Sequence, residues 1–492
     1  MNLKRREFLY GAAAFSTIPL KGWAESLPSL KLGIASDLHI ASDALWQKDN
    51  PLCKWQCTGA IRRALRYFRE KDVDAVVLCG DLADNGLTDE LMCLSRAWYE
   101  IFPDDRLPSG KKVEKIFILG NHDWESWGGG KVRNQIIPNP QERARHILKN
   151  HVKEAWRKAF HEDFSPVVDK TVKGYRFCGA NWPYHRECKS FLESFAKKCD
   201  PSKPFFYVQH PHLKGSVYGS WAWGCDDGVA TSILSRYPNA IALSGHSHYT
   251  LTDERSIWQD SFTSIAAGSL RYTAPVKGFE NTGGDGSEFK QMPVVSHGWC
   301  AQAMCMTLEN GIASCERVDF GVSGAMYEIL GSDWVFPAIA KGSDVYSFVK
   351  RAENAKAPAF AAEAKVSVVV IKDGKTRGGR PVKQVGVSFP AALTSSVGRG
   401  RALSYEVEVL QSDADFSSLS VAKRRVLGYG FNKSEQHAWK PGETDVSCVF
   451  SVDALPFGSK LEFRAYAIES FGKRSSSISS GVIQLGKVVN GR

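Results

Sequence analysis

The residues that could do chemistry in this sequence are histidines and aspartates that follow short apolar runs. In one such place, residues 241–243 are followed by Ser244 and Gly245 and then by His246 and His248. Alternate residues of an extended or tightly turned segment can point toward two neighbouring points in space. One such pair would indicate little by itself, because histidine pairs are also common in ordinary loops.

Four further apolar runs deliver related residue types onto the loops that follow them. Carboxylate, imidazole and amide side chains without a thiolate suit manganese, iron or zinc. Four strand-end motifs and one further histidine in a single chain exceed what chance produces, so the pattern predicts a metal centre. The additional residues are Asp37 and His39, Asp81 and Asp84, Asn121, His122 and Asp123, and the single His210.

Alternating strands and helices are expected to position these residues. The pattern indicates a layered α/β fold, in which ligands collect beyond the carboxyl ends of the strands. Strands are expected at residues 30–36, 74–78, 115–119, 175–179, 205–209 and 240–244, and helices at 58–69, 91–102, 142–160 and 230–237. Residues 262–266, 303–308 and 313–320 are expected to form a second sheet that closes a sandwich, with an Asn310-Gly311 turn in the last hairpin.

Taken together, the five motifs resemble those of the calcineurin-like metallophosphoesterase superfamily, over residues 30–320. The pattern is Asp-x-His, Gly-Asp-x-x-Asp, Gly-Asn-His-Asp, a later His, and Gly-His-x-His, and every part is present. The resemblance implies a four-layer α/β/β/α sandwich and a hydrolase that acts on phosphoric ester bonds.

The resemblance also implies two divalent metal ions, manganese, iron or zinc. Two such ions neutralise the charge of the phosphoryl group and deprotonate a bridging water that attacks phosphorus. Asp81 would bridge the two ions. By this resemblance one ion is bound by Asp37, His39, Asp81 and His248, and the other by Asp81, Asn121, His210 and His246.

His122 has a different role by the same resemblance, because it protonates the leaving alkoxide as a general acid. Such catalysis contributes about 10²–10⁴-fold. Asp84 would orient His122 and keep it protonated, with Asp123 as the alternative partner; a helix N-cap or turn role is the other interpretation of Asp84.

Asn121 and His212 are the expected substrate contacts. His210 and His212 both compete for one ligand position, and His210 is preferred because it directly ends its apolar run. Asn85 follows Asp84 where protein Ser/Thr phosphatases carry a phosphate-binding arginine, which argues against that activity. Residues 181–185 could either line the substrate cleft or pack as an aromatic cluster.

The substrate is expected to be a small-molecule phosphoester or a glycan- or nucleotide-linked one. A phosphodiesterase or nucleotidase, or an inert surface binding protein, are the alternatives. The formal net charge is +10, and without residues 1–24 it is +7 (59 basic and 52 acidic residues). This charge is mild and is spread along the chain, so we expect no specific nucleic-acid binding. No apolar segment reaches the length of about 20 residues that a transmembrane anchor requires.

Residues 1–24 resemble a twin-arginine export signal. Arg5 and Arg6 precede an apolar dipeptide and a weakly apolar stretch over residues 10–20. Removal near Ala24 would give a periplasmic or secreted protein. A frayed basic helix is the alternative interpretation.

Twelve cysteines are scattered through the chain and do not have the spacing of a small disulfide framework. Buried free thiols are therefore expected for most of them. Two pairs lie close enough in sequence to be checked, Cys53 with Cys57 and Cys188 with Cys199.

The C-terminal part is expected to be all β. Residues 321–358 are predicted to be a connector with Trp334–Pro337 docked on one domain, and residues 359–488 an immunoglobulin- or fibronectin-like β-sandwich. Alternation of apolar and polar residues in segments such as 405–410 indicates half-buried antiparallel strands. Residues 461–473 resemble the last hairpin of a fibronectin type III domain.

Overall fold

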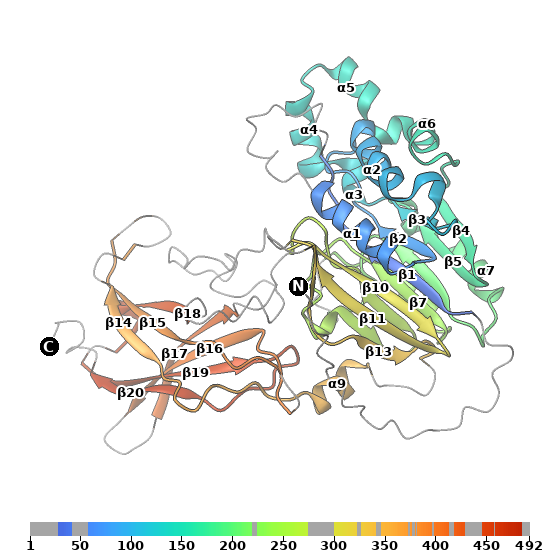
Figure 1. Cartoon of the computed structure of the whole chain (residues 1–492). Helices are drawn as coiled ribbons and strands as arrows, with labels where there is room; N and C mark the ends of the chain where they lie inside the picture. The colour runs from blue at the N-terminus through green and yellow to red at the C-terminus, as the bar shows by residue number, and fades with distance from the viewer. Residues whose placement is uncertain are drawn as a thin grey trace, which may run out of the picture.

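Two β-sheets pack against each other in the first part of the chain, and two further sheets follow in the C-terminal part (Figure 1). The computed structural model describes residues 28–41, 58–218, 224–273, 300–321, 326–340, 346–371, 374–375, 379, 381–395, 398–412, 418–428, 445–456 and 458–484. The expected leader at residues 1–24 and the pair Cys53 and Cys57 lie outside these described residues. Among the helices described, none combines the length and apolar character needed to cross a membrane.

Among the described residues, the first sheet has seven strands. Its order is β12 (Glu328–Ile329), β11 (Ile312–Asp319), β10 (Gln302–Glu309), β1 (Leu30–Ala35), β2 (Ala75–Cys79) and β3 (Glu114–Ile118), with β13 (Trp334–Pro337) paired to β11. β1, β2 and β3 are parallel, whereas β10 runs antiparallel to β1. The carboxyl ends of β1, β2 and β3 therefore lie at one edge of the sheet.

The second sheet has six strands within the described ranges. Its order is β4 (Val167–Val172), β5 (Tyr175–Ala180), β6 (Phe205–Gln209), β7 (Ala240–Ser244), β9 (Thr263–Ala266) and β8 (Ile257–Gln259). β5, β6, β7 and β9 are parallel. β2, β6 and β7 are buried at every position, as continuous apolar runs in a parallel sheet should be.

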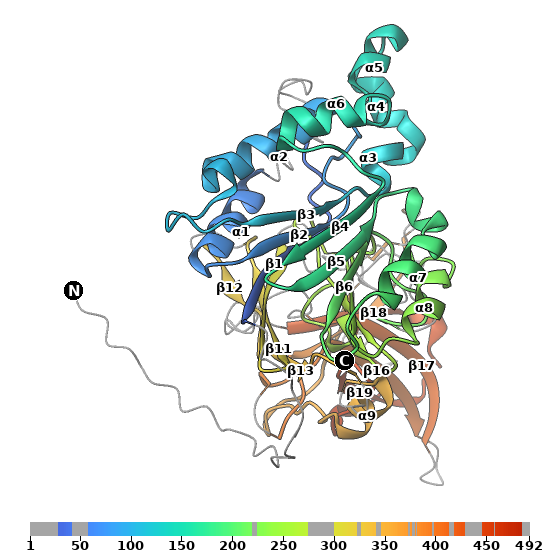
Figure 2. The same ribbon diagram turned by 90° about the vertical axis from the view of Figure 1, so that its right-hand side faces the viewer.

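In the described part of the chain, three large apolar cores lie between these sheets and their helices. One lies between the first sheet and α1 (Thr58–Glu70), α2 (Thr88–Ile101) and α6 (Leu148–Phe160), and includes Trp98. The second lies between the two sheets and includes Leu32 and Phe206. The third lies between the second sheet and α7 (Lys189–Lys197) and α8 (Val229–Leu234). Figure 2 shows α1, α2 and α6 on one side of the first sheet and α7 and α8 beside β6. The expected mixed α/β character is confirmed.

The expected composition of the second sheet was wrong. β10 and β11 extend the first sheet, with Leu30 opposite Leu308, and β9 instead joins β7 in the other sheet. An apolar run can satisfy its hydrogen bonds and its buried faces in either sheet, so its pattern does not specify the neighbouring strand.

The helix expected over residues 142–160 is two helices, α5 (Pro140–His146) and α6. Ile147 between them has an extended backbone (ψ 119°) and forms an isolated bridge with Leu87. The Leu148 N–H donates to the Gly86 carbonyl at 2.7 Å. Tertiary bonding to the loop after β2 therefore interrupts an otherwise helical pattern.

Several short elements complete this part of the chain. They are η2 (Pro103–Asp105), α3 (Asn121–Glu125), η3 (Trp127–Gly130), α4 (Lys131–Ile136), η4 (Tyr184–Glu187) and η6 (Glu254–Ser256). Together with β4 and α7, these elements were not predicted. The Asn310-Gly311 turn between β10 and β11 is confirmed, and both residues have positive φ (50° and 77°), as a tight hairpin turn requires.

The segment expected to be a connector contributes to the first sheet. β13 pairs with β11, placing Trp334 opposite Cys315, which confirms the predicted docking of this segment. The helix α9 (Phe348–Asn354) follows it.

The described residues beyond 359 form two antiparallel sheets, in agreement with the expected strands. One sheet is β14 (Ser367–Ile371), β15 (Gln384–Pro390) and β18 (Asp445–Ser451), and the other is β17 (Ser418–Leu427), β16 (Ser404–Ser412), β19 (Lys460–Ile468) and β20 (Ile478–Gln484), with η10 (Val452–Ala454) after β18. Val385 and Phe450 from the first pack with Val407 and Phe463 from the second in one core.

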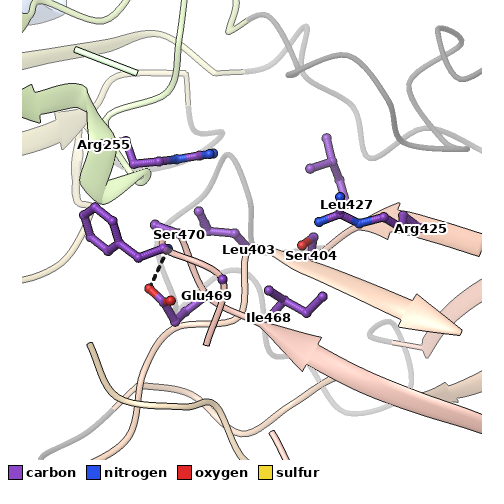
Figure 3. Close-up of a pocket in the computed structure, with 10 residues that line it drawn as sticks. Arg255, Leu403, Ser404, Arg425, Leu427, Ile468, Glu469 and Ser470 are labelled. Atoms are coloured by element: carbon purple, nitrogen blue, oxygen red, sulfur yellow. Dashed lines mark hydrogen bonds between the residues drawn. The ribbon is translucent and has the colours of Figure 1, made fainter. Parts of the chain in front are cut away.

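The C-terminal sheets contact the first part of the chain through Glu254 and α9. Glu254 accepts a bond from the Arg351 guanidinium at 2.6 Å, and its backbone N–H donates to Ser470 Oγ at 3.2 Å. A cavity of about 360 Å³ lies at this contact. Arg255 from η6 and Arg425 from β17 approach it from opposite sides (Figure 3).

The cysteines in the described part of the chain are free thiols, and most of them are buried, as expected. Cys188 and Cys199 are both free and do not form the bond considered from their spacing.

Candidate metal centre

The two sheets bring all five sequence motifs together at the carboxyl ends of their parallel strands. Backbone hydrogen bonds join the loops directly: Asp37 N–H donates to the Gly80 carbonyl at 3.0 Å, and Gly245 N–H donates to the His210 carbonyl at 2.8 Å. The predicted residues follow β1 (Asp37, His39), β2 (Asp81, Asp84), β3 (Asn121, His122), β6 (His210, His212) and β7 (His246, His248).

The backbone at many of these residues is left-handed. Non-glycine residues rarely adopt this conformation, and holding them there costs about 1–3 kcal/mol each. Such sharp local turns direct side chains from successive loops toward one point. The positive φ values are 51° at Asp37, 45° at His39, 51° at Asp81, 73° at His246 and 54° at His248.

Glycines allow the loops to approach one another. A Cβ on Gly80, whose φ is +100°, would lie 2.4 Å from His210 Nδ1. A Cβ on Gly120 would lie 2.2 Å from Asp81 Oδ1. Both distances are too short for any side chain, so glycine is required where the motifs meet.

Among the described residues, three groups of possible metal ligands result, and within each group the ligand atoms lie within 4.8 Å of one another. Asp81 belongs to two of them, because its Oδ2 lies 3.1 Å from His210 Nε2 and 3.6 Å from His39 Nε2. The groups are Asp37, His39 and His248; His39, Asp81 and His122; and Asp81, His210 and His246. Asn121 Oδ1 lies beside the third group, 3.1 Å from His210 Nε2.

Converging imidazole nitrogens and carboxylates suit divalent cations. His39 Nε2 and His248 Nε2 approach to 3.1 Å, and both lie close to the carboxylate of Asp37. These residues therefore fit the metal ions that the sequence implies.

The electrostatics of the cluster agree with a need for positive charge. Burial would raise the pKa of Asp81, but the neighbouring His210 and His122 outweigh it and hold that pKa below its ordinary value. Burial would lower the pKa of His39, but its bonds to Asp37 and Asp84 raise it to about 10. Protons on His39 and His210, whose pKa values are both raised, thus supply positive charge beside the carboxylates, and a metal ion would replace them.

His122 is oriented by a backbone group. Its Nδ1 lies 3.0 Å from the Asp84 carbonyl oxygen, which can only accept, so Nδ1 carries the proton in this bond. The Asp84 carboxylate lies 3.2 Å from His39 Nδ1 and 4.0 Å from His122 Nδ1. The predicted Asp84–His122 carboxylate pair is thus a longer contact than the Asp84–His39 pair.

Asp123, the alternative partner for His122, instead ties two loops together. Its carboxylate accepts the backbone N–H groups of Leu82, Ala83 and Gly120 at 3.1, 2.6 and 2.7 Å. Asp84 is not a helix N-cap, since Leu87 occupies that position in α2.

His210 belongs to one of the donor groups, whereas His212 belongs to none of them and is buried. His212 is 1% exposed, its Nδ1 is 2.8 Å from Ser244 Oγ, and its ring stacks on Tyr249. His212 Nε2 is buried and has no hydrogen-bond partner among the residues that the structure describes. The expected contact of His212 with a substrate stays a prediction, as does that of Asn121.

Residues 181–185 pack beside His246. The Trp182 N–H donates to the Leu119 carbonyl, its Nε1 donates to Glu125 at 3.0 Å, and its ring lies 6.4 Å from that of His246. Trp182 is only 8% exposed. The burial of Trp182 favours the interpretation that residues 181–185 pack as an aromatic cluster, with the Trp182 ring near that of His246.

Sequence reasoning missed residues 269–272, the loop that follows β9. Ser269 Oγ and the Tyr272 carbonyl both lie near His248 Nδ1, at 3.1 and 3.0 Å. Arg271 Nη1 donates to the His39 carbonyl at 2.7 Å. The available signal was Gly268 and Ser269 just after an apolar strand, but the loop offers none of the usual ligand types.

Two packed sheets whose strand ends gather aspartates, histidines and an asparagine into overlapping donor groups define a metallohydrolase-type domain. Residues 30–250 match the family model described as calcineurin-like phosphoesterase. Residues 30–250 thus form a domain that matches the calcineurin-like phosphoesterases, and this match supports a hydrolase of phosphoric esters.

Solved structures are similar at low identity. A dimetal phosphatase from Danio rerio is 12% identical, with 63% of this chain and 99% of that chain covered and a TM-score of 0.35. The purple acid phosphatase PPD1 from yellow lupin is 14% identical, with 63% and 54% covered and a TM-score of 0.37. A vacuolar protein sorting 29 from Cryptosporidium parvum is 11% identical, with 63% and 98% covered and a TM-score of 0.28. No curated protein matches the sequence.

Proposed function

We propose that this protein is an exported, dinuclear metal-dependent phosphoesterase. The observation that carries the proposal is the position of Asp81, whose carboxylate joins the donor group containing His39 to the one containing His210. A carboxylate shared in this way suits two ions held side by side.

The chain offers two sets of ligands for these ions. Manganese, iron or zinc would supply positive charge for the phosphoryl oxygens and lower the pKa of a water molecule. One set is Asp37, His39, Asp81 and His248, and the other is Asp81, Asn121, His210 and His246.

His122 would give a proton to the departing alkoxide. Because its Nδ1–H is directed to the Asp84 carbonyl, Nε2 is the ring atom that would carry this proton. His122 lies in the donor group with His39 and Asp81, so its proton is delivered next to the ligands.

Export and the C-terminal region complete the proposal. The basic pair Arg5 and Arg6 and the weakly apolar stretch after it support a twin-arginine leader and a periplasmic or secreted location. The two antiparallel sheets on one core support an immunoglobulin- or fibronectin-like sandwich. N-terminal sequencing of the mature protein tests the leader, and an intact Met1 would rule out cleavage near Ala24.

The activity is tested with p-nitrophenyl phosphate and bis-p-nitrophenyl phosphate, with manganese, iron or zinc added, for the mature protein and His122→Ala. Metal-dependent turnover that falls in the variant supports the proposal. The ratio of the two rates separates a monoesterase from a phosphodiesterase. Absence of both turnover and bound metal would favour an inert binding protein.

A further inference from the structure

Arg271 lies at the edge of the donor cluster on the side of His122. Its Nη1 is 2.7 Å from the His39 carbonyl and 3.7 Å from Asp84 Oδ2. The Asp84 carboxylate is in turn 4.0 Å from His122 Nδ1. A guanidinium thus lies near the proposed general acid.

The loop that carries Arg271 is fixed to the donor loops by its backbone. Leu270 N–H donates to the Ser36 carbonyl at 3.0 Å, and Arg271 N–H donates to the Asp37 carbonyl at 3.1 Å. Tyr272 packs its ring 4.3 Å from that of His248. Arg271 is 11% exposed, so its charge is held in place rather than free in solvent.

Asn85, where protein Ser/Thr phosphatases carry an arginine, cannot supply this contact. Its side chain is fully buried and donates to Glu90 Oε1 at 3.2 Å. The loop after β2 therefore turns position 85 into the protein interior. Position 85 therefore offers no side-chain cation to a substrate, whereas Arg271 holds a guanidinium 3.7 Å from Asp84 Oδ2 at the edge of the cluster.

The charge of Arg271 bears on the type of ester. A phosphomonoester carries a charge of about −1.5 to −2 at pH 7 and three non-bridging oxygens, as a phosphorylated side chain does. A diester carries one charge and two such oxygens. Charge-assisted bonds from a guanidinium to phosphate are among the strong hydrogen bonds.

We infer that Arg271 binds the phosphoryl group of the substrate and makes the site selective for phosphomonoesters over diesters. This inference rests on the proposed phosphoesterase function. By this inference, the doubly charged phosphoryl group of a monoester is recognised by the loop over residues 269–272, which lies outside the five motifs.

The test compares Arg271→Ala and Arg271→Lys with the parent, all loaded with metal. We measure kcat/KM for p-nitrophenyl phosphate and its bis ester, orthophosphate binding by calorimetry, and metal content by mass spectrometry. Arg271→Ala should lower the monoester value about 10- to 100-fold and weaken orthophosphate binding by a similar factor. The diester value should change less than about threefold. Arg271→Lys should keep part of the monoester kcat/KM and part of the orthophosphate affinity that Arg271→Ala loses.

The matched control is Arg157→Ala, which removes an exposed arginine paired with Asp163 on the surface. It should change none of these quantities. Equal losses for both esters with unchanged orthophosphate binding would overturn the inference and make Arg271 a positioning residue for His39 or Asp84. Loss of bound metal in both variants would overturn it as well.

Failure of the proposed function gives a different result. If the metal-loaded parent hydrolyses neither ester, the activity is refuted, but the orthophosphate measurement still decides the role of Arg271. Unchanged binding in Arg271→Ala would then overturn the inference, and weakened binding would support it.

Discussion

The backbone carbonyl of Asp84, and not its carboxylate, accepts the hydrogen bond from His122 Nδ1, while that carboxylate lies against His39 Nδ1. One residue therefore orients two histidines of the centre by two different groups. A carbonyl holds His122 in a fixed tautomer without adding a negative charge at hydrogen-bond distance.

Asp84→Asn should consequently weaken metal binding more than it weakens general acid catalysis by His122. The carboxylate that supports His39 is lost, which typically weakens metal binding by about 10- to 100-fold. At saturating metal, kcat should stay within about tenfold of the parent, whereas His122→Ala should lose about 10²-fold or more. Metal titrations followed by rate measurements check this, and equal losses of kcat in the two variants would show that the carboxylate serves His122.

Asp81→Asn should abolish both metal binding and turnover, because Asp81 is shared by two donor groups. Metal content and p-nitrophenyl phosphate hydrolysis measure the two effects. Asp169→Asn, which removes an exposed carboxylate paired with Arg176, is the control and should behave as the parent. Turnover that survives Asp81→Asn would remove the assigned centre from the mechanism.

Gly80→Ala should displace His210. The new methyl group would lie 2.4 Å from His210 Nδ1, and φ at this residue is +100°. We expect loss of metal binding and destabilisation beyond the roughly 1 kcal/mol that a left-handed alanine costs. Gly110→Ala isolates that backbone cost, because Gly110 also has positive φ (+85°) but a methyl group there would meet no atom within 4 Å. Thermal unfolding and metal content that are alike in the two variants would contradict the prediction.

Glu90 should make stability depend on pH. Burial, and then the charge of Asp84, raise the pKa of Glu90 from its ordinary 4.5 to about 8. Because the folded-state pKa is the higher one, the contribution of Glu90 to stability is fully present below pH 4.5 and is lost as pH rises through about 8.

The difference in Tm between the parent and Glu90→Gln, measured from pH 4.5 to 8, isolates this effect. The parent should lose more stability than the variant as pH rises. Glu100→Gln, at an exposed pair with Arg62, should run parallel to the parent. Parallel curves for Glu90→Gln would show that Glu90 is ionised throughout the folded state.

Much of the candidate site could be predicted from the sequence, because its residues lie immediately after apolar strands. Asp37, Asp81 and His246 are next to or near the last residue of β1, β2 and β7, and parallel strands carry such residues to one edge of a sheet. Local patterns also predicted the Asn310-Gly311 turn and the docking of Trp334–Pro337.

The tertiary structure alone decided which strands are neighbours. β9 and β10 are both short, largely apolar segments, yet they lie in different sheets. Either sheet could bury both faces of either strand, so the sequence pattern does not determine which sheet each strand joins. The break at Ile147 has the same origin, because its partner Leu87 is distant in sequence.

The same distinction holds within the centre. The types and order of the candidate ligands are properties of the sequence, because carboxylate, imidazole and amide side chains are the types that suit a divalent cation. The parts played by Asp84, Asp123 and Arg271 depend on which atom faces which, and that follows from left-handed turns and bonds between loops that are far apart in the chain.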